Sequence, residues 1–282
     1  MNLLTFRDAG LGRSIPVPLG CCVQPSNDWL RCPSSMTRRR QPKIFMGGRF
    51  AQYRTAIDCL EALGANLADF WTGLETRPLG RYNVAPGSRV LLLKRQDAGL
   101  HPDPLICGYL SCWARRVQRP PMINARVETA AARKMFRGIW RTGRALVGAD
   151  RWYEWQKDPD HPQHKQPYFM QLKSRVPMFF AAIGHFLPAS DPGPHEDAGF
   201  VIITAAADAG MIDIHDRRPP VLPPDVAREW IDPELCADRI AAIGREAATP
   251  ADAFAWYSVS QAVGSVKNDG PDLLTLIDNP LL

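Results

Sequence analysis

Residues 123–129 (Ile-Asn-Ala-Arg-Val-Glu-Thr) alternate between apolar and polar side chains. In a β-strand this period of two places Asn124, Arg126 and Glu128 on one face and the apolar residues on the other. An amide, a guanidinium and a carboxylate in a row are costly to bury unless each has a partner or a ligand. The stretch is therefore either one wall of a binding site or a half-solvated strand whose polar face meets water.

A second candidate is Glu154, a single carboxylate among the aromatic residues Trp152, Tyr153 and Trp155. Burial against such side chains raises the pKa of a carboxyl group and makes it a general acid or base near neutral pH. The alternative is a glutamate at the edge of the core whose carboxylate points to water.

The third candidate is His215, in the segment Asp-Ile-His-Asp-Arg-Arg-Pro at residues 213–219. A histidine flanked by aspartates and followed by Arg217 and another arginine could transfer protons beside an anion site. Five ionisable groups in six residues are also typical of a salt-bridged surface loop. We favour the functional interpretation, because the segment follows an apolar strand predicted at residues 200–204.

Trp113 is followed closely by Arg115, Arg116 and Arg119. An aromatic ring among arginines suits single-stranded nucleic acid, whose bases stack on the ring while the phosphates pair with the cations. The alternative is a basic surface loop whose long side chains cover apolar surface.

The composition is that of a globular protein, with 45% hydrophobic and 22% charged residues in 282. We expect no membrane span, because no run of about 18 apolar residues occurs. We also expect no secretion, because no apolar signal-peptide region opens the chain. The net charge of +5 favours a polyanionic partner.

The seven cysteines are odd in number and irregularly spaced. Cys107 and Cys112 are too far apart for a CxxC pair, so the pattern predicts neither a disulfide framework nor a zinc site. Nucleotide-binding glycine loops and the HExxH and GxSxG motifs are also missing from the sequence. We therefore predict no metal and no cofactor, and a protein of the reducing cytoplasm.

The elements that must position these residues are mostly strands, with scattered helices and no regular βα alternation. Strands are predicted after the glycine pair at 47–48 and at 90–94, 104–110, 145–155, 168–172, 178–183, 200–204 and 254–259. Helices are predicted at 130–136 after an N-cap at Thr129, at 225–231, at 236–246, and from an N-cap at Thr55 to Gly64. This pattern predicts an α+β fold on a mixed or antiparallel, barrel-like sheet with flanking helices.

Residues 1–45 differ from the rest, because they contain five prolines, the run Arg38-Arg39-Arg40 and no sustained period. A disordered basic tail or a mis-assigned start codon would explain this. We favour a start at Met46, where the pattern becomes regular. The division is then an unpatterned leader at 1–45 and one domain at 46–282.

Five blocks of the sequence, in this order, resemble the SOS-response-associated peptidase (SRAP) family of abasic-site processing proteins. They are Met46 to Phe50, Gly80 to Pro86, Ile123 to Thr129, Trp152 to Trp155 and Ile214 to Pro219. The resemblance extends from Met46 to about Asn268. It implies a single α+β domain around a curved mixed sheet.

The resemblance also implies an activity on single-stranded DNA that contains abasic sites. In the family, loss of the initiator methionine exposes an N-terminal cysteine, whose amine and thiol capture the sugar aldehyde as a thiazolidine. By similarity, the reacting residue here is Gly47, with Asn124, Glu154 and His215 as active-site residues around it. His215 would help open the sugar ring, and Glu154 would move protons during imine chemistry.

DNA contacts are implied by the same resemblance. Arginines would hold phosphates on either side of the lesion, and a turn and a tryptophan would shape the DNA path. These residues are Arg49, Arg126, Arg217, Asn83, Pro86 and Trp113. We expect a monomeric, nucleoid-associated protein of the cytoplasm.

The chain departs from the family at the nucleophile, because Gly47 stands where the family has cysteine. Without the thiol a stable thiazolidine cannot form. The free α-amine of Gly47 could still form an imine with the aldehyde and support strand cleavage as a lyase. The alternative is a module that binds abasic or single-stranded DNA without reacting. The peptidase activity in the family's name would concern removal of the chain's own leader or methionine.

Overall fold

The first element of the computed structural model is β1 (Arg49–Gln52), the strand predicted after the glycine pair. The structure describes residues 48–65, 77–96, 99–186, 198–208, 210–246 and 248–277. β1 is buried along its length and pairs antiparallel with β2 (Arg81–Val84) and β7 (Arg151–Lys157). The sheet has the order β13-β8-β7-β1-β2, in which β8 spans Lys165–Leu172 and β13 spans Phe254–Ser258.

A second sheet of eight strands follows the path β11-β10-β9-β6-β3-β4, and β12 and β5 pair with β9 and β10. Its strands are β3 (Arg89–Gln96), β4 (Gly99–Ile106), β5 (Asn124–Arg126), β6 (Arg144–Ala149), β9 (Met178–His185), β10 (Gly199–Ala206), β11 (Arg217–Arg218) and β12 (Val221–Leu222). The sheet is mixed, because β5 runs parallel to β10 while the other strand pairs are antiparallel. The predicted α+β class is confirmed, although neither sheet closes into a barrel within the described residues.

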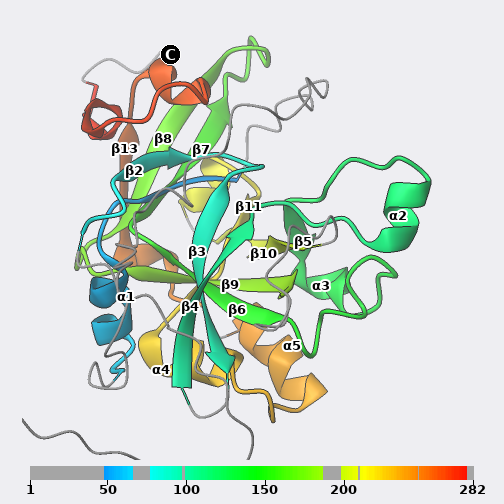
Figure 1. The fold of residues 1–282 in the computed structure, drawn as a ribbon. Helices are drawn as coiled ribbons and strands as arrows, with labels where there is room; N and C mark the ends of the chain where they lie inside the picture. Colours follow the sequence, from blue (N-terminus) through cyan, green and yellow to red (C-terminus); the bar gives the residue numbers. More distant parts are fainter. Residues whose placement is uncertain are drawn as a thin grey trace, which may run out of the picture.

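Helices cover the larger sheet and lie at the edges of the fold (Figure 1). They are α1 (Ala56–Ala62), α2 (Cys112–Arg116), α3 (Val127–Ala130), α4 (Pro224–Trp230) and α5 (Ala237–Glu246). α4 packs on β6 and β9, and α5 packs on β10, through a core that includes Trp230, Ile240 and Ile243. Among the described residues, no helix combines the length and the apolar character that crossing a membrane requires.

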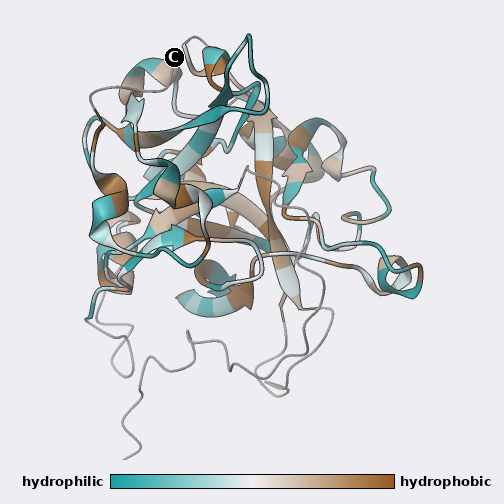
Figure 2. Ribbon diagram, turned by 90° about the horizontal axis from the view of Figure 1, so that it is seen from above, coloured by the Kyte–Doolittle hydropathy of each residue, from teal (hydrophilic) through white to brown (hydrophobic). Residues whose placement is uncertain are grey.

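A second core fills the space between the two sheets and contains Phe50, Trp152 and Phe180. The ring of Trp152 lies edge-on to Phe180 and Phe254, with centroid separations of 6.0 and 5.4 Å. Figure 2 shows hydrophobic residues on the strands inside the body, and Figure 1 shows that the segment with α2 extends away from it.

The polar strand predicted at residues 123–129 is shorter than expected. β5 ends at Arg126, which is the N-cap of α3, so the predicted cap at Thr129 is wrong. Glu128 consequently lies in the first turn of a helix rather than on the strand. Burial of Val127 and Ala130 against the α5 side of the core favours this early turn.

The helix predicted at 130–136 is also wrong, because the chain forms a series of turns from residue 131 to residue 142. These turns, instead of a helix, bury the side chains of Phe136, Ile139 and Trp140 in the core. Gly138, within the same stretch, lowers its helix propensity.

The strand predicted at 145–155 divides at Asp150 into β6 and β7, which belong to different sheets. The Asp150 carboxylate accepts hydrogen bonds from the backbone N–H groups of Tyr53 (2.6 Å) and Arg54 (3.1 Å), and it pairs with the Arg54 guanidinium at 2.7 Å. Asp150 is thus the residue at which the chain passes from one sheet to the other.

The N-cap predicted at Thr55 is confirmed. The Thr55 hydroxyl accepts from the backbone N–H of Asp58, whose carboxylate accepts from the N–H of Thr55 in return. Gly64 follows the helix with a positive φ of 68°, a conformation that glycine adopts without strain.

Close packing at the start of β6 provides a test of the fold. A Cβ atom on Gly143 would lie 2.0 Å from the carbonyl oxygen of Gly184, whereas one on Gly138 would meet nothing within 4 Å. We expect Gly143→Ala to lower the free energy of unfolding by about 2 kcal/mol or more, because backbone must move. Gly138→Ala should change it by less than about 1 kcal/mol. Urea denaturation of both variants measures this, and equal effects would contradict the packing.

Candidate active site

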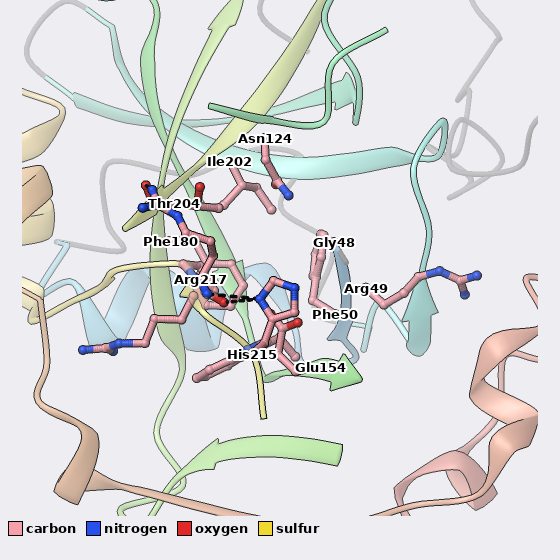
Figure 3. A pocket seen from close by; sticks show the side chains of 13 residues that line it. Gly48, Arg49, Phe50, Asn124, Glu154, Phe180, Ile202, Thr204, His215 and Arg217 are labelled. Atoms are coloured by element: carbon pink, nitrogen blue, oxygen red, sulfur yellow. Dashed lines mark hydrogen bonds between the residues drawn. The ribbon is translucent and has the colours of Figure 1, made fainter. Parts of the chain in front are cut away.

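Three of the predicted polar residues meet in one pocket at the start of β1. Asn124, Glu154 and His215 line it together with Gly48 (Figure 3). The pocket has a volume of about 50 Å³, which accommodates a few atoms or waters rather than a large ligand. The remaining wall is formed by Arg49, Phe50, Trp152, Phe180, Ile202, Thr204, Arg217, Arg218 and Pro219.

Each polar residue comes from a different part of the fold. Asn124 begins β5 and pairs with Ile202 of β10 in the larger sheet. Glu154 lies in the middle of β7 in the smaller sheet. His215 follows the short helix η3 (Met211–Asp213) and precedes β11. The pocket therefore lies where the two sheets and one connecting segment meet.

Glu154 is buried, with 7% of its surface exposed, and the flanking residues Trp152, Tyr153 and Trp155 are buried as well. Burial raises the pKa of the Glu154 carboxyl to about 8, and the nearby Asp216 carboxylate adds to the rise. The interpretation of Glu154 as a buried carboxyl is confirmed, and the alternative of a water-facing glutamate is wrong. At neutral pH the group is mostly protonated and is able to donate a proton.

His215 is held by the backbone of Arg217. Its Nδ1 lies 2.9 Å from the Arg217 carbonyl oxygen and 3.1 Å from the Arg217 nitrogen. Because these contacts occupy Nδ1, the Nε2 atom is the one available for proton transfer. Figure 3 shows the imidazole beside Glu154, with Gly48 across the pocket.

Arg217 joins two sides of the site through its guanidinium. It binds both carboxylate oxygens of Glu128, at 2.8 and 2.9 Å, and the carbonyl oxygen of Thr204 at 2.6 Å. The hydrogen bond from Arg217 holds the pKa of Glu128 below its usual value. A DNA phosphate at Arg217 would have to share the guanidinium with Glu128 or displace it.

Arg49 contributes its backbone to the pocket, while its side chain points away (Figure 3). The guanidinium donates to Asn83 Oδ1 at 2.8 Å and to the carbonyl oxygens of Val263 (3.3 Å) and Gly264 (3.1 Å). Asn83 in turn donates to three carbonyl oxygens of residues 263–268. Both residues are almost completely buried, so in this structure they hold a loop in place rather than present a surface to DNA.

Three further predicted residues lie outside the pocket. Arg126 is exposed at the end of β5, and Pro86 lies in the turn between β2 and β3. Trp113 is in α2, with Arg119 and Lys134 over its ring at 5.3 and 5.0 Å. Gly47, the predicted reacting residue, lies outside the described residues.

Several lining residues are not indicated by the sequence. Phe180 and Ile202 lie in apolar runs of β9 and β10, where nothing in the sequence distinguishes a pocket wall from the core around it. The one available signal is Thr204, a polar residue at the end of an apolar run.

Known proteins resemble this chain over most of its length. The profile of the SOS response associated peptidase (SRAP) family matches residues 46–266. The chain is 46% identical over 231 residues to the abasic site processing protein YedK of Escherichia coli, covering 81% of this chain and 99% of YedK. It is 31% identical to the abasic site processing protein YoqW of Bacillus subtilis, with the same coverage of both chains.

Among solved structures, the chain resembles a phage-related protein of Bordetella bronchiseptica, with a TM-score of 0.62 and 36% identity. The match covers 76% of this chain and 94% of that protein. A protein of Bacteroides thetaiotaomicron has the same TM-score at 18% identity and supports the fold alone. The family profile matches most of the chain, and the identity to YedK extends over nearly the whole length of YedK. The chain therefore belongs to the SRAP family.

Proposed function

We propose that this protein processes abasic sites in single-stranded DNA and reacts with the sugar aldehyde through the α-amine of Gly47. The observation that carries the proposal is the pocket at Gly48, into which Asn124, Glu154 and His215 converge. The Cα atom of Gly47 is at most about 3.8 Å from that of Gly48. Gly47 is bonded directly to Gly48, which lines the pocket.

The proposed start of the chain follows from the same requirement. A free amine at Gly47 needs either initiation at Met46 followed by removal of that methionine, or cleavage of the chain before Gly47, and the family match begins at residue 46. The leader at 1–45 is then either absent from the native protein or cleaved by the peptidase activity that the family's name describes. Intact mass of the native protein distinguishes a terminus at Gly47 from one at Met1.

The chemistry that we propose has two steps. First, the Gly47 amine adds to the ring-opened aldehyde, and loss of water from the adduct gives an imine. Glu154, protonated at neutral pH, donates the proton that lets the hydroxyl leave as water. Second, the Glu154 carboxylate left by this transfer takes a proton from the carbon next to the imine, the C–O bond to the 3′-phosphate breaks, and the strand is cut.

His215 and Asn124 would act on the sugar. We propose that Nε2 of His215 assists opening of the sugar ring; the Asn124 amide, which points toward the same space, supports a role beside it (Figure 3). Because Gly47 has no thiol, the imine is not trapped as a thiazolidine, and the attachment to DNA is transient.

A binding module without reactivity is the second candidate. The exposed Arg126 and the cationic residues around Trp113 would suffice for it. The enzyme is favoured because a buried carboxyl such as Glu154 is costly to retain and contributes nothing to binding phosphates. With DNA as its substrate, we place the protein in the cytoplasm at the nucleoid.

DNA binding gives the first test. We expect affinity for single strands to exceed that for duplex and to fall with salt, because phosphate contacts release counterions. Trp113→Ala should weaken single-strand binding by about 1 kcal/mol or more through lost stacking. Fluorescence anisotropy at two salt concentrations measures both effects, with the exposed Val176→Ala as control. Equal affinity for single strands and duplex would rule out the predicted preference.

Restoring the thiol gives the second test. A chain that starts at Met46 and carries Gly47→Cys should form a heat-stable crosslink with abasic single-stranded DNA, because amine and thiol can then close a thiazolidine. A denaturing gel reveals the product as a shifted band, and Gly47→Ser is the matched control without sulfur. A folded Gly47→Cys protein with its methionine removed and no shifted band would show that the pocket does not support this reaction.

The third test addresses the imine itself. Borohydride should reduce it to a permanent link between Gly47 and the abasic strand, and acetylation of the terminus should abolish trapping. The rate should be greatest near pH 8, because the amine loses its proton with a pKa of about 7.7–8.0 while Glu154 ionises at about 8. Glu154→Gln should slow trapping about 100-fold and remove the decline above pH 8. Trapping that survives acetylation would mean that another group is the nucleophile.

A further inference from the structure

The hairpin that joins β7 to β8 carries a second cluster of chemically capable side chains, outside the pocket. Asp158, His161 and His164 lie within residues 158–164, and one ligand atom from each is within 4.8 Å of the other two. Asp158 is partly buried, while both histidines are exposed. The cluster contains no cysteine, so the irregular cysteine spacing, which argues against a zinc site made of sulfur ligands, does not apply to it.

Backbone hydrogen bonds hold the hairpin in the shape that brings the three side chains together. The N–H of Asp158 donates to the carbonyl oxygen of His164 at 3.1 Å, and the N–H of His164 donates to that of His161 at 2.7 Å. Pro159 and Pro162 fix two further backbone angles in the same seven residues. The donors are thus presented by an ordered turn rather than by an unstructured loop.

The Asp158 carboxylate is oriented within the turn. One oxygen accepts from the backbone N–H groups of Asp160 (2.9 Å) and His161 (3.1 Å). The other oxygen faces His161 Nδ1 at 3.5 Å. The imidazoles of His161 and His164 lie nearly parallel, with ring centroids 5.6 Å apart and an angle of 27°. One carboxylate oxygen and two imidazoles therefore face a common space.

This set of donors matches the requirements of a tetrahedral transition-metal site. Two ligands at about 2.0–2.1 Å from a tetrahedral metal are separated by about 3.4 Å, so the exposed histidines need to rotate inward by about an ångström. Two imidazoles and a carboxylate suit Zn²⁺, Ni²⁺ or Cu²⁺, whereas Mg²⁺ and Ca²⁺ prefer sites made of oxygen alone. Three protein ligands leave one position for water or for the exposed Asp160.

We propose that Asp158, His161 and His164 form a binding site for one divalent transition-metal ion, with zinc as the expected occupant. The site is separate from the pocket at Gly48, because none of its residues lines that pocket. It lies on the hairpin whose first strand carries Glu154, and Gln156 of that strand donates to the carbonyl oxygen of Asp213 at 3.0 Å. A bound ion would cross-link the loop at the tip of this hairpin.

Calorimetric titration of the untagged full chain with Zn²⁺ tests the proposal. We expect one equivalent to bind, and His161→Ala and His164→Ala each to weaken it at least about tenfold. The matched control is His101→Ala, which removes an exposed histidine of β4 outside the cluster and should bind zinc like the unaltered protein. Loss of binding in the control would assign the ion to another site.

Cobalt substitution distinguishes this site from the cysteines. Co²⁺ bound by the cluster should show visible absorption bands without a sulfur-to-metal charge-transfer band, and these bands should vanish in the His161→Ala/His164→Ala double variant. Zinc should also raise the Tm of the unaltered protein and leave that of a folded double variant unchanged. Sulfur-to-metal charge transfer, or binding that persists in the double variant, would overturn the proposal.

Discussion

The site depends on the register of β1 against β7. Arg49 pairs with Tyr153 and Phe50 pairs with Trp152, so Gly48 arrives beside Glu154 at the edge of the core between the sheets. Because side chains alternate along a strand, a slip of one residue would turn Glu154 away from the pocket. The register is strongly specified, since the same slip would remove Trp152 from its contacts with Phe180 and Phe254. Apolar packing thereby fixes the position of a carboxyl group.

The polar side of the pocket is held by a different kind of interaction. Arg217 binds Glu128 with its guanidinium and His215 with its backbone, so one residue links α3 to the imidazole. Charge-assisted bidentate contacts have a defined geometry, which suits the orientation of a proton-transfer group. Arg49 has a similar role for the loop at 263–268, although it uses carbonyl oxygens instead of a carboxylate. Arg49 and Arg217, to which the family resemblance assigns phosphate binding, therefore also hold segments of the protein in place.

The cationic side chains around the site fall into two classes, those paired within the protein and those exposed at its surface. Arg49 and Arg217 are committed to partners inside the protein, whereas Arg126 is exposed at the end of β5. Arg119 and Lys134 lie over the ring of Trp113 on the projecting segment with α2. If DNA binds as we propose, the outer cations are the ones that can pair with phosphate without breaking internal contacts.

The α+β class, the capped helix at Thr55 and the residue types of the site could all be predicted from the sequence. Each follows from local rules, namely strand alternation, capping chemistry and the ordered blocks of a family resemblance. Local patterns also misled, as at residues 130–136, where the pattern predicts a helix and the chain forms exposed turns that bury only the side chains of Met135 and Phe136 after residue 130. The burial of Glu154, the commitment of Arg49 to Asn83 and the meeting of Asn124 with His215 were decided only by the tertiary structure. The physical reason is that burial, pKa and ion pairing depend on groups far apart in the chain, which the pairing of strands brings together.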